Sequence, residues 1–156
     1  MKKLLLTLTF AVFTFTLSAQ EQAIKVNPIG LAFGVANIGY EFAVNEANTL
    51  TFSGLYYDRD NIEGFGVGAE YRFYFDKNAL RGWHAGPSIG YLSLEDDFNN
   101  SAGIVAIGGE IGHQWILSEH FLVDTFAGLG VFTGESDAID VNGVSLSLGV
   151  SIGYAW

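Results

Sequence analysis

The stretch VSLSLGVSIGYAW, Val144–Trp156, decides the fold of this chain. Large apolar residues fill its even positions, and Ser, Gly or Ala fills its odd positions. A period of two is typical of a β-strand, whose successive side chains point to opposite faces of a sheet. Neither face carries a charge, whereas a soluble barrel would coat its exterior with Lys and Glu. The stretch therefore predicts a strand of a small membrane barrel, with the apolar face toward lipid and the small residues toward a narrow lumen.

The same alternation continues through the rest of the chain. Phe65–Phe75 places bulky apolar residues on one face and Gly66, Gly68, Glu70, Arg72 and Tyr74 on the other. Short polar clusters separate such runs, which predicts strands at about 24–36, 37–44, 49–57, 65–75, 82–94, 103–116, 121–132 and 143–156. The expected fold class is all-β: an eight-stranded antiparallel up-and-down transmembrane β-barrel.

The connections between these strands alternate in character. Residues 45–48, 76–81 and 117–120 form compact turns, whereas residues 58–64, 95–102 and 133–142 are longer and acidic. Outer-membrane barrels pair short periplasmic turns with longer extracellular loops. A very short first outer loop near Ala36-Asn37 departs from this pattern. Aromatic residues near the compact turns and the C-terminus predict a periplasmic girdle of Phe73, Phe75, Trp83, Trp115, Phe121, Tyr154 and Trp156; Tyr56, Phe65 and Tyr91 would form the outer one.

The beginning of the chain looks like a secretory leader. Lys2 and Lys3 precede an apolar run from Leu4 to Leu17, which ends in Ser18-Ala19. A basic start, a short apolar stretch and a small-residue exit are typical of a cleaved signal peptide. We therefore expect residues 1–19 to be removed and residues 20–156 to form one barrel domain in the outer membrane.

Composition excludes several classes of protein. The net charge is −10 and there is no Cys, so a nucleic-acid partner, a disulfide framework and a thiolate metal site are not expected. Beyond the leader, no apolar run is long enough for a membrane-spanning helix.

Charged residues also fall on the lumen side of the predicted strands. Such charges must be paired or hydrogen-bonded in a narrow lumen, because the effective dielectric there is low. Arg72 is the sole inward Arg and would be the centre of a network, with Gln114 also inward. The favoured interpretation is a salt-bridged plug; the alternative is a relay or gate that opens a narrow pore for ions or small solutes. The predicted network comprises Glu41, Glu70, Arg72, His84, Glu110 and Asp124.

Catalysis is not expected, and no catalytic residue is assigned. An acyl-chain enzyme at the lipid face would need a nucleophile beside a base, but His113 has Ile111 and Trp115 as same-face neighbours. His84 and Ser88 lie roughly 13 Å apart along a strand. The acidic loops lack the spacing of an EF-hand, so neither a metal site nor a cofactor is predicted.

Four segments carry a resemblance to known proteins. Val150, Ile152, Tyr154 and Trp156 resemble the last strand of outer-membrane barrels, which the barrel-assembly machinery recognises as an assembly signal. The other segments resemble a small Gram-negative outer-membrane β-barrel family of unknown function, with the eight-stranded architecture of OmpA and OmpX. They are Asn37–Glu41, Tyr71–Phe75 with Gly86-Pro87 and Gly90-Tyr91, and Gly112–Trp115 with Ala127–Gly130.

The resemblance implies location but transfers no activity. We expect a monomer that contacts outer-membrane lipid and lipopolysaccharide, and that meets the assembly machinery during insertion. The expected function is a structural or interaction role in the cell envelope. A narrow channel and, less favoured, a lipid-modifying enzyme are the alternatives.

Overall fold

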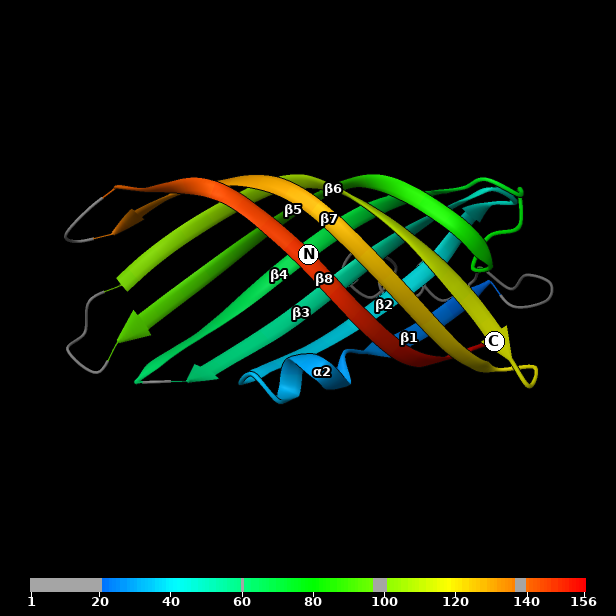
Figure 1. Ribbon diagram of the computed structural model, residues 1–156, viewed down its shortest axis with the longest axis horizontal. Coiled ribbons are helices and arrows are strands. Elements are labelled where there is room, and N and C mark those ends of the chain that lie inside the picture. Colours follow the sequence, from blue (N-terminus) through cyan, green and yellow to red (C-terminus); the bar gives the residue numbers. More distant parts are fainter. Residues whose placement is uncertain (1–20, 60, 97–100, 137–139) are drawn as a thin grey trace, which may run out of the picture.

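A computed structural model describes residues 21–59, 61–96, 101–136 and 140–156. The expected leader, residues 1–19, lies outside these ranges. The described chain forms a closed eight-stranded antiparallel up-and-down barrel in which each strand pairs with the next and β1 pairs with β8 (Figure 1). This confirms the all-β barrel predicted from the alternation. The elements are β1 (Gln22–Val26), α2 (Pro28–Leu31), β2 (Val35–Asn45), β3 (Asn48–Arg59), β4 (Ile62–Tyr74), β5 (Gly82–Asp96), β6 (Ser101–Leu117), β7 (Phe121–Ser136) and β8 (Asp140–Ala155).

The first predicted strand, 24–36, is wrong. β1 ends at Val26, and the short helix α2 follows it before β2 begins at Val35. Pro28 occupies the first turn of the helix, and the Asn27 side chain caps it by accepting a hydrogen bond from the Gly30 amide. Proline lacks the N–H that a strand needs for pairing but suits the first turn of a helix. The predicted very short first loop at Ala36-Asn37 is therefore also wrong, since both residues lie within β2.

The predicted long loops are shorter than expected. β3 continues to Arg59 and β4 starts at Ile62, and these two residues are register partners. β5 and β7 likewise run on to Asp96 and Ser136. The acidic residues Asp60, Asp97 and Asp137 lie outside the described residues. The compact turns at the other end, residues 46–47, 75–81 and 118–120, agree with the prediction.

We call the end of the barrel with residues 46–47, 75–81 and 118–120 the proximal end and the opposite end the distal end. The proximal end lies to the right in Figure 1. Within the described ranges, no helix has the length and hydrophobicity needed to cross a membrane.

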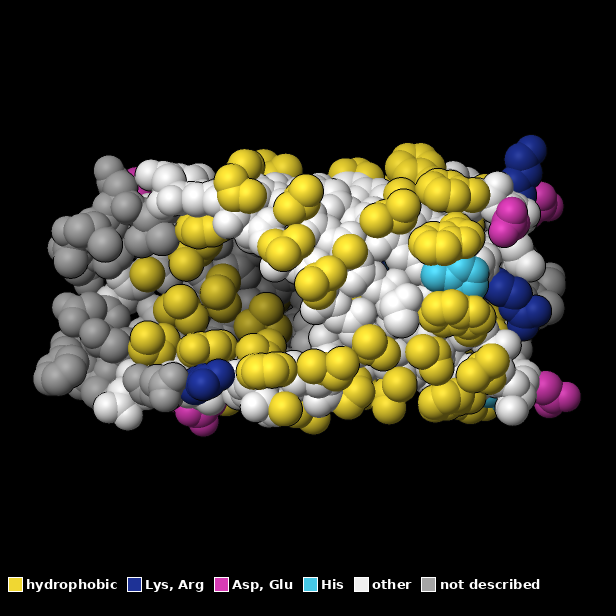
Figure 2. Space-filling view, viewed as in Figure 1, with side chains coloured by type: hydrophobic (Ala, Val, Ile, Leu, Met, Phe, Trp, Pro, Cys, Tyr) yellow, Lys and Arg dark blue, Asp and Glu magenta, His cyan; other side chains and the backbone are white. Residues whose placement is uncertain are grey.

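Burial in this barrel is inverted relative to a water-soluble protein. Val144, Leu146 and Leu148 of β8 are 75%, 68% and 70% exposed, while Ser151 on the opposite face is buried. Large hydrophobic side chains cover the outer surface seen in Figure 2. Among the described residues, buried polar and charged side chains outnumber the buried hydrophobic ones, and they lie inside the barrel: Lys25, Glu41, Thr49, Thr51, Glu70, Arg72, His84, Gln114, Asp124 and Ser151.

Candidate functional site

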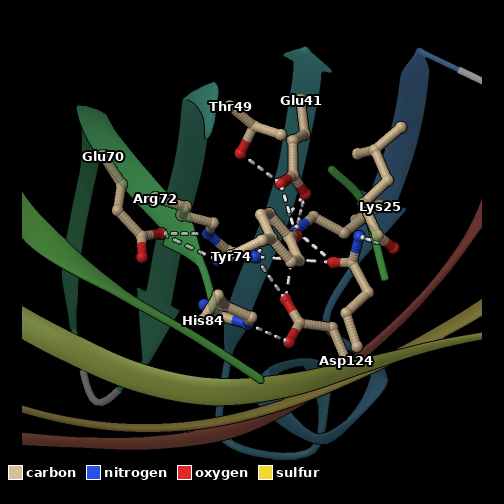
Figure 3. A network of polar contacts seen from close by, with 10 residues as sticks. Lys25, Glu41, Thr49, Glu70, Arg72, Tyr74, His84 and Asp124 are labelled. Carbon is tan, nitrogen blue, oxygen red and sulfur yellow. Dashed lines mark hydrogen bonds and ion pairs between the residues drawn. The ribbon is translucent and has the colours of Figure 1, made fainter. Parts of the chain in front are cut away.

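A cluster of buried polar side chains fills the proximal half of the lumen (Figure 3). Strand alternation turns one or more side chains of each strand from β1 to β7 toward it, so residues far apart in sequence meet around one point. Its members are Lys25 (β1), Glu41 (β2), Thr49 (β3), Glu70, Arg72 and Tyr74 (β4), His84 (β5), Gln114 (β6) and Asp124 (β7). We call these nine residues the charge layer.

Glu41 is held by four partners in the charge layer. One oxygen accepts hydrogen bonds from Thr49 Oγ1 at 2.6 Å and the Tyr74 hydroxyl at 2.8 Å. The other oxygen lies 2.6 Å from Lys25 Nζ and 3.5 Å from Arg72 Nη1. Glu41 is completely buried. A carboxylate can remain charged at such a site because it is paired and hydrogen-bonded.

Asp124 connects the two cations of the charge layer. Its Oδ2 lies 3.0 Å from Lys25 Nζ and 2.7 Å from Arg72 Nη1, and its Oδ1 lies 3.0 Å from His84 Nε2. Arg72 also binds Glu70: its Nε and Nη2 lie 2.8 Å and 2.7 Å from Glu70 Oε2. Arg72 therefore touches three carboxylates, which matches its predicted place at the centre of the network.

A hydrophobic lid closes the proximal mouth beyond the charge layer. Leu80, from the connection between β4 and β5, is fully buried against Ala23, Leu122 and Ala155. Gln114 Nε2 donates to the Leu80 carbonyl at 2.9 Å, and Gln114 Oε1 accepts from Lys25 at 3.2 Å. The lid and the charge layer are thus joined through one amide side chain.

Most of the predicted network meets at this site. Glu41, Glu70, Arg72, His84 and Asp124 lie in the charge layer. Glu110 faces the same lumen but stands apart, where it accepts a hydrogen bond from Ser147 Oγ at 3.2 Å.

Sequence reasoning missed Lys25, Thr49 and Tyr74 as members of the network. Lys25 makes two ion pairs, so Arg72 shares its role with a second cation. The alternation contains the signal for it, since Lys25 lies between Ile24 and Val26, which are both 41% exposed.

The chemistry of the charge layer is that of a filled, hydrogen-bonded core. His84 contacts Asp124, and the hydroxyls of Thr49 and Tyr74 both donate to Glu41. Within the described part of the chain, His84 Nε2 contacts Asp124 and its Nδ1 has no hydrogen-bond partner, so no hydroxyl nucleophile of this layer is bonded to a histidine base, as acyl transfer would require. His113 lies instead on the outer face between Trp83 and Trp115, with ring centroids 5.1 Å and 4.2 Å away.

The residues of the predicted assembly signal lie at the proximal end of β8. Tyr154 and Trp156 are 50% and 45% exposed, and the Tyr154 ring stacks on His120 at 4.8 Å. Val150 and Ile152 are half-buried on the same strand. Their role in assembly stays a prediction.

Comparison with known proteins identifies a family but no activity. No curated protein and no solved structure matches the chain. A family model described as "Protein of unknown function (DUF3575)" matches residues 4–142, which is most of the sequence. The chain therefore belongs to the DUF3575 family of proteins of unknown function.

Proposed function

We propose that this protein is an outer-membrane β-barrel of the cell envelope, with a closed lumen and a structural or interaction role. The observation that carries the proposal is the inverted burial. Apolar side chains such as Leu148, Phe65 and Trp83 are more than half exposed, while Lys25, Glu41 and Arg72 are at most 4% exposed. In water, so much exposed apolar surface would drive association; in a bilayer it is the stable arrangement.

Aromatic side chains support a membrane position. Phe73, Trp83, Trp115, Phe121 and Tyr154 all project outward near the proximal end, with exposed fractions between 41% and 53%. Trp and Tyr are enriched at membrane interfaces because an apolar ring there meets a hydrated headgroup layer. A leader of the secretory type at residues 1–19 fits the same location.

The closed lumen favours a structural or interaction role over a channel. The charge layer and the Leu80 lid occupy the proximal half, and their side chains are buried against one another. Opening a pore would require separating ion pairs that are already taken out of water, which is costly.

Location is tested first. The mature protein should fractionate with the outer membrane, and an unheated sample should migrate differently from a boiled one in SDS gels, as folded barrels do. The boiled sample is the control for the unfolded chain. Recovery as a soluble periplasmic species would overturn the proposal.

Closure is tested on protein refolded into planar bilayers. We expect no discrete single-channel openings at neutral pH. Reproducible conductance steps from the wild-type protein would favour the channel alternative.

Lipid A profiles of cells with and without the protein test the enzyme alternative. We expect the two profiles to be identical.

A further inference from the structure

The barrel wall is incompletely paired where its two ends meet. β1 pairs with β8 only from Ala23↔Ala155 to Val26↔Ile152, because β1 stops at Val26. By contrast, β7 pairs with β8 from Phe121↔Tyr154 to Glu135↔Asp140. In the described part of the chain, β8 distal to Ile152 therefore has no strand partner on its β1 side. The helix α2 lies beside both β2 and β8 at this place.

This gap opens into a cavity in the distal half of the lumen. The cavity has a volume of about 540 Å³, and residues from both sides of the gap line it: Asn37 and Gly39 of β2, and Ser145 and Ser147 of β8. Figure 2 shows the molecule hollowed beside β8, with hydrophobic side chains visible inside the hollow. The volume is within the range of roughly 300–1,000 Å³ that is usual for small-molecule sites.

The lining of the cavity is apolar where barrel lumens are usually polar. Five large hydrophobic side chains point inward and line the cavity: Leu55, Leu92, Ile104, Phe126 and Phe132. All are half-buried rather than packed away. Apolar side chains offer few hydrogen bonds to water, so this part of the cavity is suited to an aliphatic chain.

The floor of the cavity presents unused hydrogen-bond acceptors. Glu70 Oε1 and Thr51 Oγ1 are buried, and neither has a hydrogen-bond partner in the described structure. The Glu70 side chain is 9% exposed, and both residues line the cavity together with Glu110. Lys25 and Arg72 also line the cavity, but both are already paired with carboxylates of the charge layer. The acceptor left without a partner is Glu70 Oε1, which a hydrogen-bond donor would satisfy and an anionic head group would not.

We propose that the distal half of the lumen binds a single-chain amphiphile, which enters sideways from the bilayer between β8 and β2, next to α2. Its alkyl chain lies against Leu92, Ile104 and Phe126, and its head, an amine or hydroxyl that donates hydrogen bonds, meets Glu70 and Thr51. This inference rests on the proposed function, since sideways entry requires that the barrel be in a membrane. The charge layer then acts as the bottom of the site and keeps the ligand from passing through.

The test uses the mature protein refolded in phosphatidylcholine vesicles, with insertion verified by the gel shift. The probe is dodecylamine with a diazirine at the end of its chain, cross-linked by light and mapped by mass spectrometry. We expect cross-links to inward residues around Leu92 and Ile104 that unlabelled dodecylamine abolishes. Cross-links to Leu146 and Leu148 on the lipid face should persist in the presence of unlabelled dodecylamine, because they come from probe dissolved in the surrounding bilayer.

Two variants on one strand separate the cavity from the outer surface. Gly90 lines the cavity, and a Cβ built there has Val67 O as its nearest neighbour at 3.5 Å, so Gly90→Phe fills the cavity with little backbone conflict. Ile89→Phe is the matched control, since Ile89 borders the cavity but its side chain is 54% exposed on the outer face. We expect Gly90→Phe to remove the competable cross-links and Ile89→Phe to keep them. If Gly90→Phe does not fold, Ala106→Phe on β6 fills the same cavity, with Ile107→Phe as its control.

The head group is tested by competition. Dodecylamine should compete about tenfold or more better than dodecanoate, and Thr51→Val and Glu70→Gln should each narrow that ratio. Equal competition by dodecanoate would overturn the assigned head group. Cross-links confined to the lipid face, or unchanged in Gly90→Phe, would overturn the binding site while the proposed membrane function stands. Failure of the wild type to insert would instead overturn the proposed function, and sideways entry with it.

Discussion

Lys25 and Arg72 donate to the same carboxylate oxygen, Oδ2 of Asp124, at 3.0 Å and 2.7 Å. Lys25 comes from the short strand β1 and Arg72 from β4, which are not neighbours in the wall. Asp124 on β7 therefore links three separated parts of the barrel across the lumen. Because β1 closes the barrel by pairing with β8, its Lys25 connects the closing strand to the other charges of the lumen.

Arg72→Ala should lower the free energy of unfolding by about 3–5 kcal/mol, because it leaves Glu70 buried without its ion-pair partner and removes the 2.7 Å contact with Asp124. Equilibrium unfolding in urea, on protein refolded in detergent micelles, measures the change. Arg81→Ala is the matched control, since Arg81 is exposed in the turn that follows β4. Equal unfolding midpoints for the two variants would contradict a buried network around Arg72.

Lys25 and Asp124 should be energetically coupled. Lys25→Met and Asp124→Asn each break the 3.0 Å ion pair, so the double variant should lose less stability than the sum of the two single losses. We expect a coupling energy of about 0.5–3 kcal/mol from a double-mutant cycle. If the two single losses of stability simply add up in the double variant, the ion pair between Lys25 and Asp124 contributes no coupling energy.

Leu148→Arg should destabilise the barrel in bilayers by roughly 2–4 kcal/mol if Leu148 lies near the midplane, since an arginine there faces hydrocarbon. Leu148 is 70% exposed, so the substitution creates no clash within the barrel. Leu148→Phe keeps the position apolar and serves as the control. A Leu148→Arg variant that folds in vesicles as well as wild type would mean that this face of β8 is not in contact with lipid.

Leu80→Ala should cost about 2–5 kcal/mol, because it empties a fully buried position at the proximal mouth. The charge layer remains beneath the lid, so bilayer conductance should stay absent even in this variant. Lys77→Ala, an exposed change in the same connection, controls for effects on the turn. Conductance gained by Leu80→Ala alone would show that the lid, rather than the charge layer, closes the lumen.

Gly86→Ala should be far more damaging than Gly90→Ala on the same strand. A Cβ at Gly86 would lie 1.7 Å from the Tyr71 carbonyl oxygen, whereas at Gly90 the nearest atom is 3.5 Å away. Backbone would have to move to admit the methyl group, at a cost of about 1–3 kcal/mol or more. The difference between the urea unfolding midpoints of the two variants measures how much stability depends on the close approach of β4 and β5 at Gly86. We expect the lower midpoint for Gly86→Ala.

The alternation was sufficient to predict the barrel and most of its inward charges, because it repeats over long, regular strands; it missed Lys25, which lies on the short strand β1. Side-chain parity alone placed Glu41 and Asp124 in one lumen, although they come from distant strands. It could not identify the partners within the charge layer, since these depend on the stagger between strands, which each turn sets locally.

The segment after Val26 shows where periodicity fails. Ile29, Leu31 and Phe33 alternate with small residues as in a strand, but they occupy odd positions, whereas Ile24 and Val26 occupy even ones. Pro28 and the capping side chain of Asn27 start a helix at this change of phase. The apolar distal cavity was equally hard to predict. It depends on β1 being too short to reach the distal half of β8, and no inward residue by itself reveals that length.

The charge layer also bears on how the chain avoids assembling incorrectly. A slip of one residue between neighbouring strands turns every side chain of a strand to the opposite face. For β1, such a slip would move Lys25 into the hydrocarbon and Ile24 into the lumen; for β4 it would do the same to Arg72. The same slip would turn large outward apolar side chains into the narrow lumen, and the misplaced charges add to that penalty. The buried charges thus make misaligned barrels costly, and they do so in each strand from β1 to β7 that contributes a charged side chain.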